Sequence, residues 1–343
     1  MMGKARIFLW DNLKFVAMIC IVVLHSSEPY KDVMPLFSKY ICPFLNNYSM
    51  VMFAIISGFW YKDKSFREMA ILYLWPCVLF SIINNIVGSN SHYVTMCPGS
   101  NYWAAFSFKP GPAMWYLMAL FLFAIATKWI RKYMSATTYL LIACVVAALI
   151  GFLPIPNRFF DIHRISSLFP VFVFGLCFRQ IFDNHNVILT QKKGIYIVIL
   201  ILCVLYNLFV IRYRPGMQGI LFKPYGLNLE AALGKWIMMI VRVVACVCII
   251  FLMPNKEYWF TKYGSRTMNV YLLHDSLIFL IYWGVLYNCH QEWYGLLCWF
   301  IGVPLLCVLL FSTPVDKFMK KVLFLDYLKS RKNESMEKEI PGV

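Results

Sequence analysis

Three ionisable side chains share one stripe of the first apolar segment of the chain, residues 6–26, which is long enough to cross a bilayer. They are Asp11, Lys14 and His25. On a helix of about 100° per residue, Lys14 and His25 lie within roughly 20° of each other and about 16 Å apart along the axis, and Asp11 lies about 40° to the other side of His25. Charge in hydrocarbon costs about 2.5–3.5 kcal/mol per residue, so such groups usually face a bundle interior and mark a pathway or a site. The alternative is that all three lie at the membrane interfaces, because both ends of the stripe are near the helix ends.

The elements that must position this stripe are membrane helices. The chain has 343 residues and is 61% hydrophobic but only 14% charged, whereas a soluble domain is about a quarter charged. We therefore expect an all-α, polytopic transmembrane helical bundle over residues 1–313. A basic cytoplasmic tail, partly disordered, is expected over 314–343, where contact with anionic membrane lipids explains its charge.

The net charge of +16 comes from short basic clusters between apolar segments, a pattern that reports membrane orientation and argues against nucleic acid as a partner. The twelve cysteines lie mostly singly within apolar segments, and no metal-type spacing occurs, so no metal is expected.

Apolar runs of about 17–21 residues predict ten spans. The sixth of them is the weakest and has a re-entrant or tilted segment as its alternative. Lys and Arg on the two alternating sets of loops number 21 and 9, which predicts that both termini lie in the cytoplasm. The predicted spans cover residues 8–27, 41–60, 69–88, 113–130, 137–153, 166–182, 194–211, 233–253, 267–287 and 295–313.

An ordered set of motifs resembles the acyltransferase-3 family of integral membrane acyltransferases. Members typically carry a basic residue, ten intervening residues and a histidine in the first helix, as Lys14 and His25 do here. Many members have Arg where this chain has Lys14, and Lys cannot make the bidentate fork of Arg. The resemblance extends over about residues 6–280 and is nearest to the fucose 4-O-acetylase-like branch. Its other pieces are FAIISGFWYKDKSFREMAILYLWPCVLFSI (53–82), PAMWYLMALFLF (112–123), FPVFVFGLCFR (169–179) and SRTMNVYLLHDSLI (265–278).

The resemblance implies transfer of an acyl group, usually acetyl, from cytoplasmic acetyl-CoA to a sugar hydroxyl on the outer side of a bacterial cytoplasmic membrane. The acceptor would be a capsule, O-antigen or exopolysaccharide unit, and the acyl-CoA and the carbohydrate would be the partners. We expect His25, with an ordinary pKa near 6.5, to be the general base for the acceptor hydroxyl. The cationic groups expected to hold the phosphates of CoA are Lys14, Lys62, Lys64 and Arg67.

The remaining candidates each have a structural alternative. Glu28 is expected to orient His25, with a solvated interfacial carboxylate as its alternative, and Asp11 is a catalytic candidate because it occupies the acidic position of the family's opening motif. The acceptor-binding candidates have loop solvation or a helix–helix hydrogen bond as their alternatives. They are Arg158, His163, Arg164, Tyr271 and His274.

Two other functions fit the same sequence. A secondary transporter or a flippase for a lipid-linked sugar also needs intramembrane charges, although no internal repeat of the kind typical of such proteins is found. A structural member of a glycan-assembly complex that has lost its activity is the third interpretation.

Overall fold

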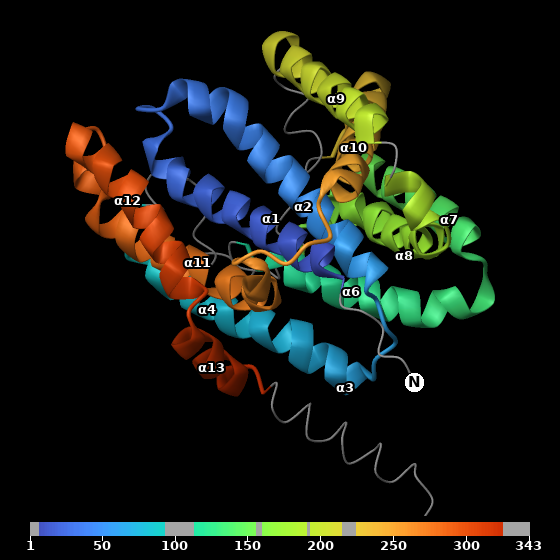
Figure 1. Cartoon of the computed structure of the whole chain (residues 1–343), viewed down its shortest axis with the longest axis horizontal. Helices are drawn as coiled ribbons and strands as arrows, with labels where there is room; N and C mark the ends of the chain where they lie inside the picture. Colours follow the sequence, from blue (N-terminus) through green and yellow to red (C-terminus); the bar gives the residue numbers. More distant parts are fainter. Residues whose placement is uncertain (1–6, 93–112, 156–159, 191–192, 215–223, 325–343) are drawn as a thin grey trace, which may run out of the picture.

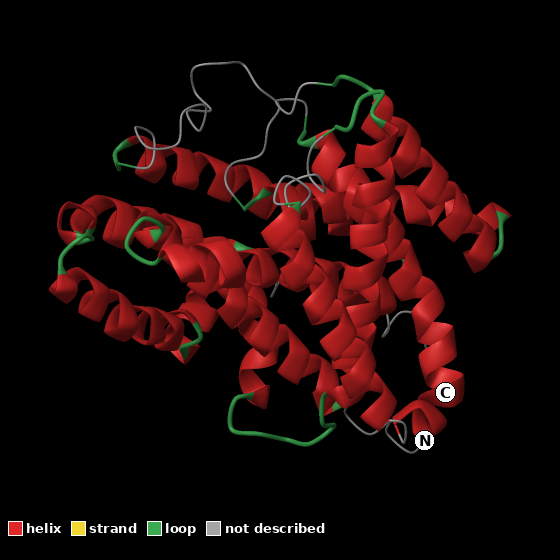
Figure 2. Cartoon of the chain, turned by 90° about the horizontal axis from the view of Figure 1, so that it is seen from above, coloured by secondary structure: helices red, strands yellow, loops and turns green. Residues whose placement is uncertain are grey.

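The computed structural model describes residues 7–92, 113–155, 160–190, 193–214 and 224–324. Within these ranges every regular element is a helix and none is a strand, which confirms the all-α prediction (Figure 2). The α-helices are α1 (Phe8–Ser27), α2 (Cys42–Phe59), α3 (Phe66–Met69), α4 (Trp75–Ser89), α6 (Trp115–Ile130), α7 (Ala136–Phe152), α8 (Ile162–Thr190), α9 (Lys193–Tyr213), α10 (Leu229–Leu252), α11 (Thr267–Leu280), α12 (Trp293–Leu310) and α13 (Thr313–Val322).

All ten predicted spans fall on helical segments of this structure. Eight helical stretches of the described chain are long and apolar enough to cross a membrane. The helices α6 and α7 are shorter, with 16 and 17 residues. The number of crossings and the side on which the termini lie stay predictions.

The first helix is the centre of the bundle. In Figure 1, α1 lies between α2 on one side and α11 and α12 on the other, and it contacts all three as well as the short helix η7 (Thr261–Arg266). Its apolar side chains are buried on several sides, among them Leu13, Val22 and Leu24. A helix that is apolar over most of its circumference is stable only inside a bundle or a membrane. The polar residues of α1 are therefore held against neighbouring helices.

The predicted sixth span lies within α8, which runs without interruption through Pro170 for 29 residues. It packs along α2 and α7 and is the most buried of the eight membrane-length stretches. By hydropathy this stretch is as apolar as the one that contains α1 and more apolar than two of the others, so the prediction that the sixth span is the weakest is wrong.

The helices α2 and α8 approach each other at a pair of glycines. A Cβ atom on Gly58 would overlap the backbone oxygen of Phe172, and one on Gly175 would overlap that of Ile55. Small residues at membrane helix interfaces permit this close backbone contact. Glycine at both positions thus allows α2 to pack directly against α8. Because α2 forms one wall of the candidate site, this contact also fixes that wall.

Replacing Gly58 by Val is expected to lower the free energy of unfolding by about 1–3 kcal/mol, because the added methyl groups push α2 away from α8. The measurement is the thermal unfolding midpoint of the protein in detergent. Gly194→Val is the matched control, since a Cβ at Gly194 meets nothing within 4 Å. Equal midpoints for the two variants would contradict this account of the contact.

The segment after residue 313 begins as an ordered helix, α13. The carboxylate of Asp316 accepts hydrogen bonds from Lys320 Nζ at 2.7 Å and from Asn269 Nδ2 of α11 at 2.9 Å. Burial alone would raise the pKa of Asp316, but these hydrogen bonds offset it and hold that pKa below its usual value. Residues 325–343 of the predicted tail lie outside the described residues.

Candidate active site

One end of the site is an ion pair on α1. Lys14 Nζ lies 2.8 Å from Asp11 Oδ1, and the two side chains are 27% and 14% exposed. The chain between α10 and α11 wraps this end of the helix, where Asn12 Nδ2 donates to the carbonyl of Lys256 at 3.0 Å. Glycine is required at position 264, because a Cβ there would collide with the backbone of Asp11. This packing fixes the direction in which Lys14 leaves the helix.

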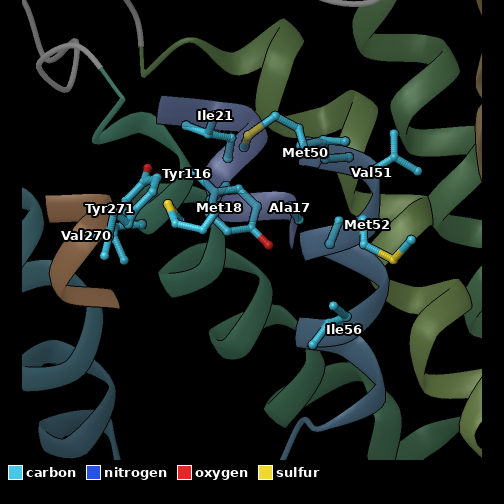
Figure 3. Packing of buried hydrophobic residues seen from close by; sticks show 14 of the residues in the cluster. Ala17, Met18, Ile21, Met50, Val51, Met52, Ile56, Tyr116, Val270 and Tyr271 are labelled. Carbon is cyan, nitrogen blue, oxygen red and sulfur yellow. The ribbon is translucent and has the colours of Figure 1, made fainter. Parts of the chain in front are cut away.

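Lys14 lines a cavity of about 170 Å³ between α1, α2, α6 and the start of α11. Figure 3 shows part of its wall, with Met18 and Ile21 of α1 beside Met50 of α2 and the rings of Tyr116 and Tyr271. The wall is mostly apolar, and among the described residues that line it Lys14 is the only cation. The cavity can accommodate a narrow, largely uncharged chain with an anion at the lysine end.

Hydroxyl groups lie along the wall of this cavity. Ser57 Oγ is 3.1 Å from the hydroxyl of Tyr116, and the hydroxyl of Tyr271 donates to the carbonyl of Ala113. Tyr116 lies in the 112–123 segment of the family resemblance, but its sequence pattern does not mark it as a site residue. A tyrosine within an otherwise apolar helix could have pointed to Tyr116. That pattern is equally typical of the aromatic belt at a membrane interface, so it does not identify a site residue.

The other end of the site contains two histidines, one from α1 and one from α11. His25 Nδ1 lies 3.1 Å from Glu28 Oε1, and the ring centroids of His25 and His274 are 5.4 Å apart. The side chain of His25 is 30% exposed and that of His274 is fully buried. Because Nδ1 of His25 donates to the carboxylate, its Nε2 keeps a lone pair that can accept a proton.

A buried carboxylate completes this cluster. His274 Nε2 is 3.2 Å from Asp275 Oδ1, and ligand-type atoms of His25, His274 and Asp275 all lie within 4.8 Å of one another. By distance and residue type these three side chains can hold a metal ion or share a proton. The sequence argument found both histidines but did not bring them together, since helix spacing gives no contact between α1 and α11.

The acceptor candidates on α8 differ in their surroundings. Arg164 pairs with Asp161 at 3.5 Å, and its guanidinium carbon lies 4.8 Å from the ring centre of Trp115. Arg164 is also near enough to His25 to act on its charge. His163 is fully buried and its Nε2 lies 2.9 Å from the carbonyl of Ile155, so it ties α8 to the end of the segment that follows α7. Arg158 lies outside the described residues.

The other predicted cations do not gather around Lys14. Lys62 and Lys64 lie in the connection between α2 and α3, where the carbonyl of Lys64 accepts a hydrogen bond from Lys128 at 2.8 Å. Arg67 lines a separate apolar groove with Trp75 and Phe324. Lys14 therefore lines the cavity, and the other three are not among the described residues that line it.

The family model for the acyltransferase domain matches residues 8–313, which is most of the chain. The protein therefore belongs to the acyltransferase-3 family, as its motifs predicted, and is a membrane acyltransferase. Comparisons with curated proteins and with solved structures gave no match.

Proposed function

We propose that this protein moves an acetyl group from cytoplasmic acetyl-CoA to a hydroxyl of a cell-surface or lipid-linked sugar, as a fucose 4-O-acetylase-like enzyme of the bacterial cytoplasmic membrane. The observation that carries the proposal is the arrangement on α1. A lysine at one end lines a cavity, and a histidine eleven residues later contacts a carboxylate at the other end. About 16 Å of helical rise separates them, which is a span that a thioester arm can bridge.

The lysine end is the proposed entrance for the donor. Lys14, held by Asp11, attracts a phosphate of CoA, and the apolar cavity beside it receives the uncharged arm. The cavity is too small for a nucleotide, so the nucleotide remains outside it. There Lys62 and Lys64 of the connection between α2 and α3 supply further positive charge together with Arg67, which lines a separate groove.

The histidine end is the proposed site of transfer. Glu28 orients His25 through Nδ1, and Nε2 takes the proton of the acceptor hydroxyl as its oxygen attacks the thioester carbonyl. Arg164, stacked on Trp115 nearby, is the proposed contact for the acceptor, because a guanidinium over an aromatic ring presents donors to sugar oxygens or to an anionic group.

The test is mass spectrometry of surface glycan from cells with and without the gene, and from cells complemented with it. Loss of one acetyl mass per repeating unit, restored by complementation, supports the proposal. An unchanged glycan that accumulates on the inner leaflet would instead select the flippase alternative.

A further inference from the structure

Two hydroxyl groups form a pair within the mostly apolar wall of the proposed donor cavity. Ser57 of α2 and Tyr116 of α6 both line this cavity, and Ser57 Oγ lies 3.1 Å from the hydroxyl oxygen of Tyr116. We call these two groups the hydroxyl pair. Tyr116 is only 5% exposed, and the lining around the pair includes the apolar side chains of Ile56 and Leu120. A polar group in such surroundings gains most when a ligand satisfies it.

The hydroxyl pair has more hydrogen-bonding capacity than it uses. Each hydroxyl has one hydrogen, and only one of the two hydrogens can lie between the two oxygens. Within the described chain, neither hydroxyl makes another hydrogen bond. One hydrogen therefore remains for a ligand. The hydroxyl that carries it is also the acceptor of the bond within the pair, which makes it a stronger donor, because hydrogen bonds in a chain polarise one another.

The other hydroxyl groups that line the cavity donate to the backbone. The hydroxyl of Tyr271 donates to the carbonyl of Ala113, and that of Thr267 donates to the carbonyl of Gly264 at 3.3 Å. Apart from the ammonium group of Lys14, the hydroxyl pair is thus the part of the described lining that has a donor left for a ligand. It can bind a carbonyl oxygen of an uncharged ligand.

The position of this pair indicates which carbonyl it binds. In the proposed function the thioester carbonyl reacts beside His25, and His25 is not among the described residues that line the cavity. The part of the donor within the cavity is then its arm, and the arm of CoA contains two amide groups. An amide oxygen is a good acceptor, and it would be costly to bury in an apolar cavity without a hydrogen bond.

We infer that the hydroxyl pair of Ser57 and Tyr116 donates a hydrogen bond to an amide carbonyl of the acyl donor's arm and so selects donors that contain this amide. This inference rests on the proposed function. It adds a specificity-determining contact to the cavity, because a site built to hydrogen-bond a polar group discriminates against an analogue that lacks the group. Lys14 attracts the charged end of the donor, whereas the hydroxyl pair recognises its uncharged arm.

The test measures the Kd of the purified full-length protein for CoA, which has the same arm as acetyl-CoA, and for two analogues. In each analogue a trans alkene replaces one amide of the arm, which keeps the shape and removes the carbonyl. Calorimetry measures binding and needs no acceptor. For one analogue, the ratio of its Kd to that of CoA should be about 5- to 50-fold larger in the unchanged protein than in the double variant Ser57→Ala, Tyr116→Phe.

The single variants Ser57→Ala and Tyr116→Phe should each reduce this ratio by less than the double variant does, because the remaining hydroxyl can still donate. They keep the test available if the double variant does not fold. Tyr139→Phe is the matched control. The hydroxyl of Tyr139 lies 3.0 Å from Thr127 Oγ1 in a second buried pair, and neither residue is among the described residues that line this cavity. This control should leave the ratio unchanged.

Equal ratios in the unchanged protein and in the double variant, for both analogues, would overturn the inference and leave the proposed function in place. An equal decrease in Tyr139→Phe would also overturn it, because the effect would then not belong to the cavity. If the unchanged protein does not bind CoA at all, the proposed function fails and the inference fails with it.

Discussion

Replacing His25 by Gln should lower the rate of acetyl transfer about 10²–10⁴-fold and leave binding of acetyl-CoA nearly unchanged. Glutamine can occupy the same space and donate to Glu28, which lies 3.1 Å from His25 Nδ1, but it cannot take a proton from the acceptor. The measurement is kcat with acetyl-CoA and an oligosaccharide acceptor, together with the Kd for acetyl-CoA. A Kd that stays constant while kcat falls assigns the loss to the chemical step.

Two variants control this result. His290→Gln changes a histidine that stacks on Tyr287 and lies outside the cluster of His25, His274 and Asp275, and it should keep normal activity. Glu28→Gln should produce a smaller loss than His25→Gln, because it weakens the orientation of the base and leaves the base in place. A His25→Gln protein that transfers acetyl at nearly the normal rate would show that another group takes the proton.

The second large effect is expected at Lys14. Lys14→Met removes the cation that lines the cavity, and a charged hydrogen bond is worth about 1.5–3 kcal/mol, so KM for acetyl-CoA should rise about 10- to 100-fold. The change in kcat should be smaller, because the base at the other end of α1 is untouched. Steady-state kinetics at varied acetyl-CoA concentration separate the two constants.

Loss of the ion pair must be distinguished from loss of the phosphate contact, because Lys14→Met also leaves Asp11 without its partner at 2.8 Å. The double variant Asp11→Asn, Lys14→Met removes both charges. It should show the same increase in KM as the single variant, whereas Lys14→Arg keeps the charge and should show a much smaller one. If the double variant recovers normal KM, the lysine serves the ion pair alone.

The sequence predicted the part of the site that lies on one helix. Lys14, His25 and Glu28 are related by helical spacing, so their common face and their order along the axis follow from the period of 3.6 residues. The contact of His25 with His274 joins residues that are 249 positions apart in the sequence. No local sequence pattern indicates that α1 and α11 pack side by side. The role of Tyr116 was hidden for the same reason, because its partner Ser57 is on another helix.

For Arg67 and for the segment after residue 313, charge was the main signal in the sequence. Arg67 was grouped with Lys14 because both are cations that the predicted spans place at the same side of the membrane. In the structure Arg67 lines a different groove. Residues 314–322 were assigned to the basic tail by their charge, and the structure folds them as α13, which docks through Asp316. Charge indicates on which side of a membrane a segment lies, whereas the individual contacts decide where it packs.

The central claim is that α1 lines a route that joins a donor on one side of the membrane to an acceptor on the other. Its most direct test uses purified protein in sealed proteoliposomes sorted by orientation. Labelled acetyl-CoA is supplied only on the side of Lys317 and Lys320, and the oligosaccharide acceptor only on the opposite side. The account predicts acetylated acceptor in the compartment that never contained acetyl-CoA. Label that appears only when donor and acceptor share a compartment would contradict it.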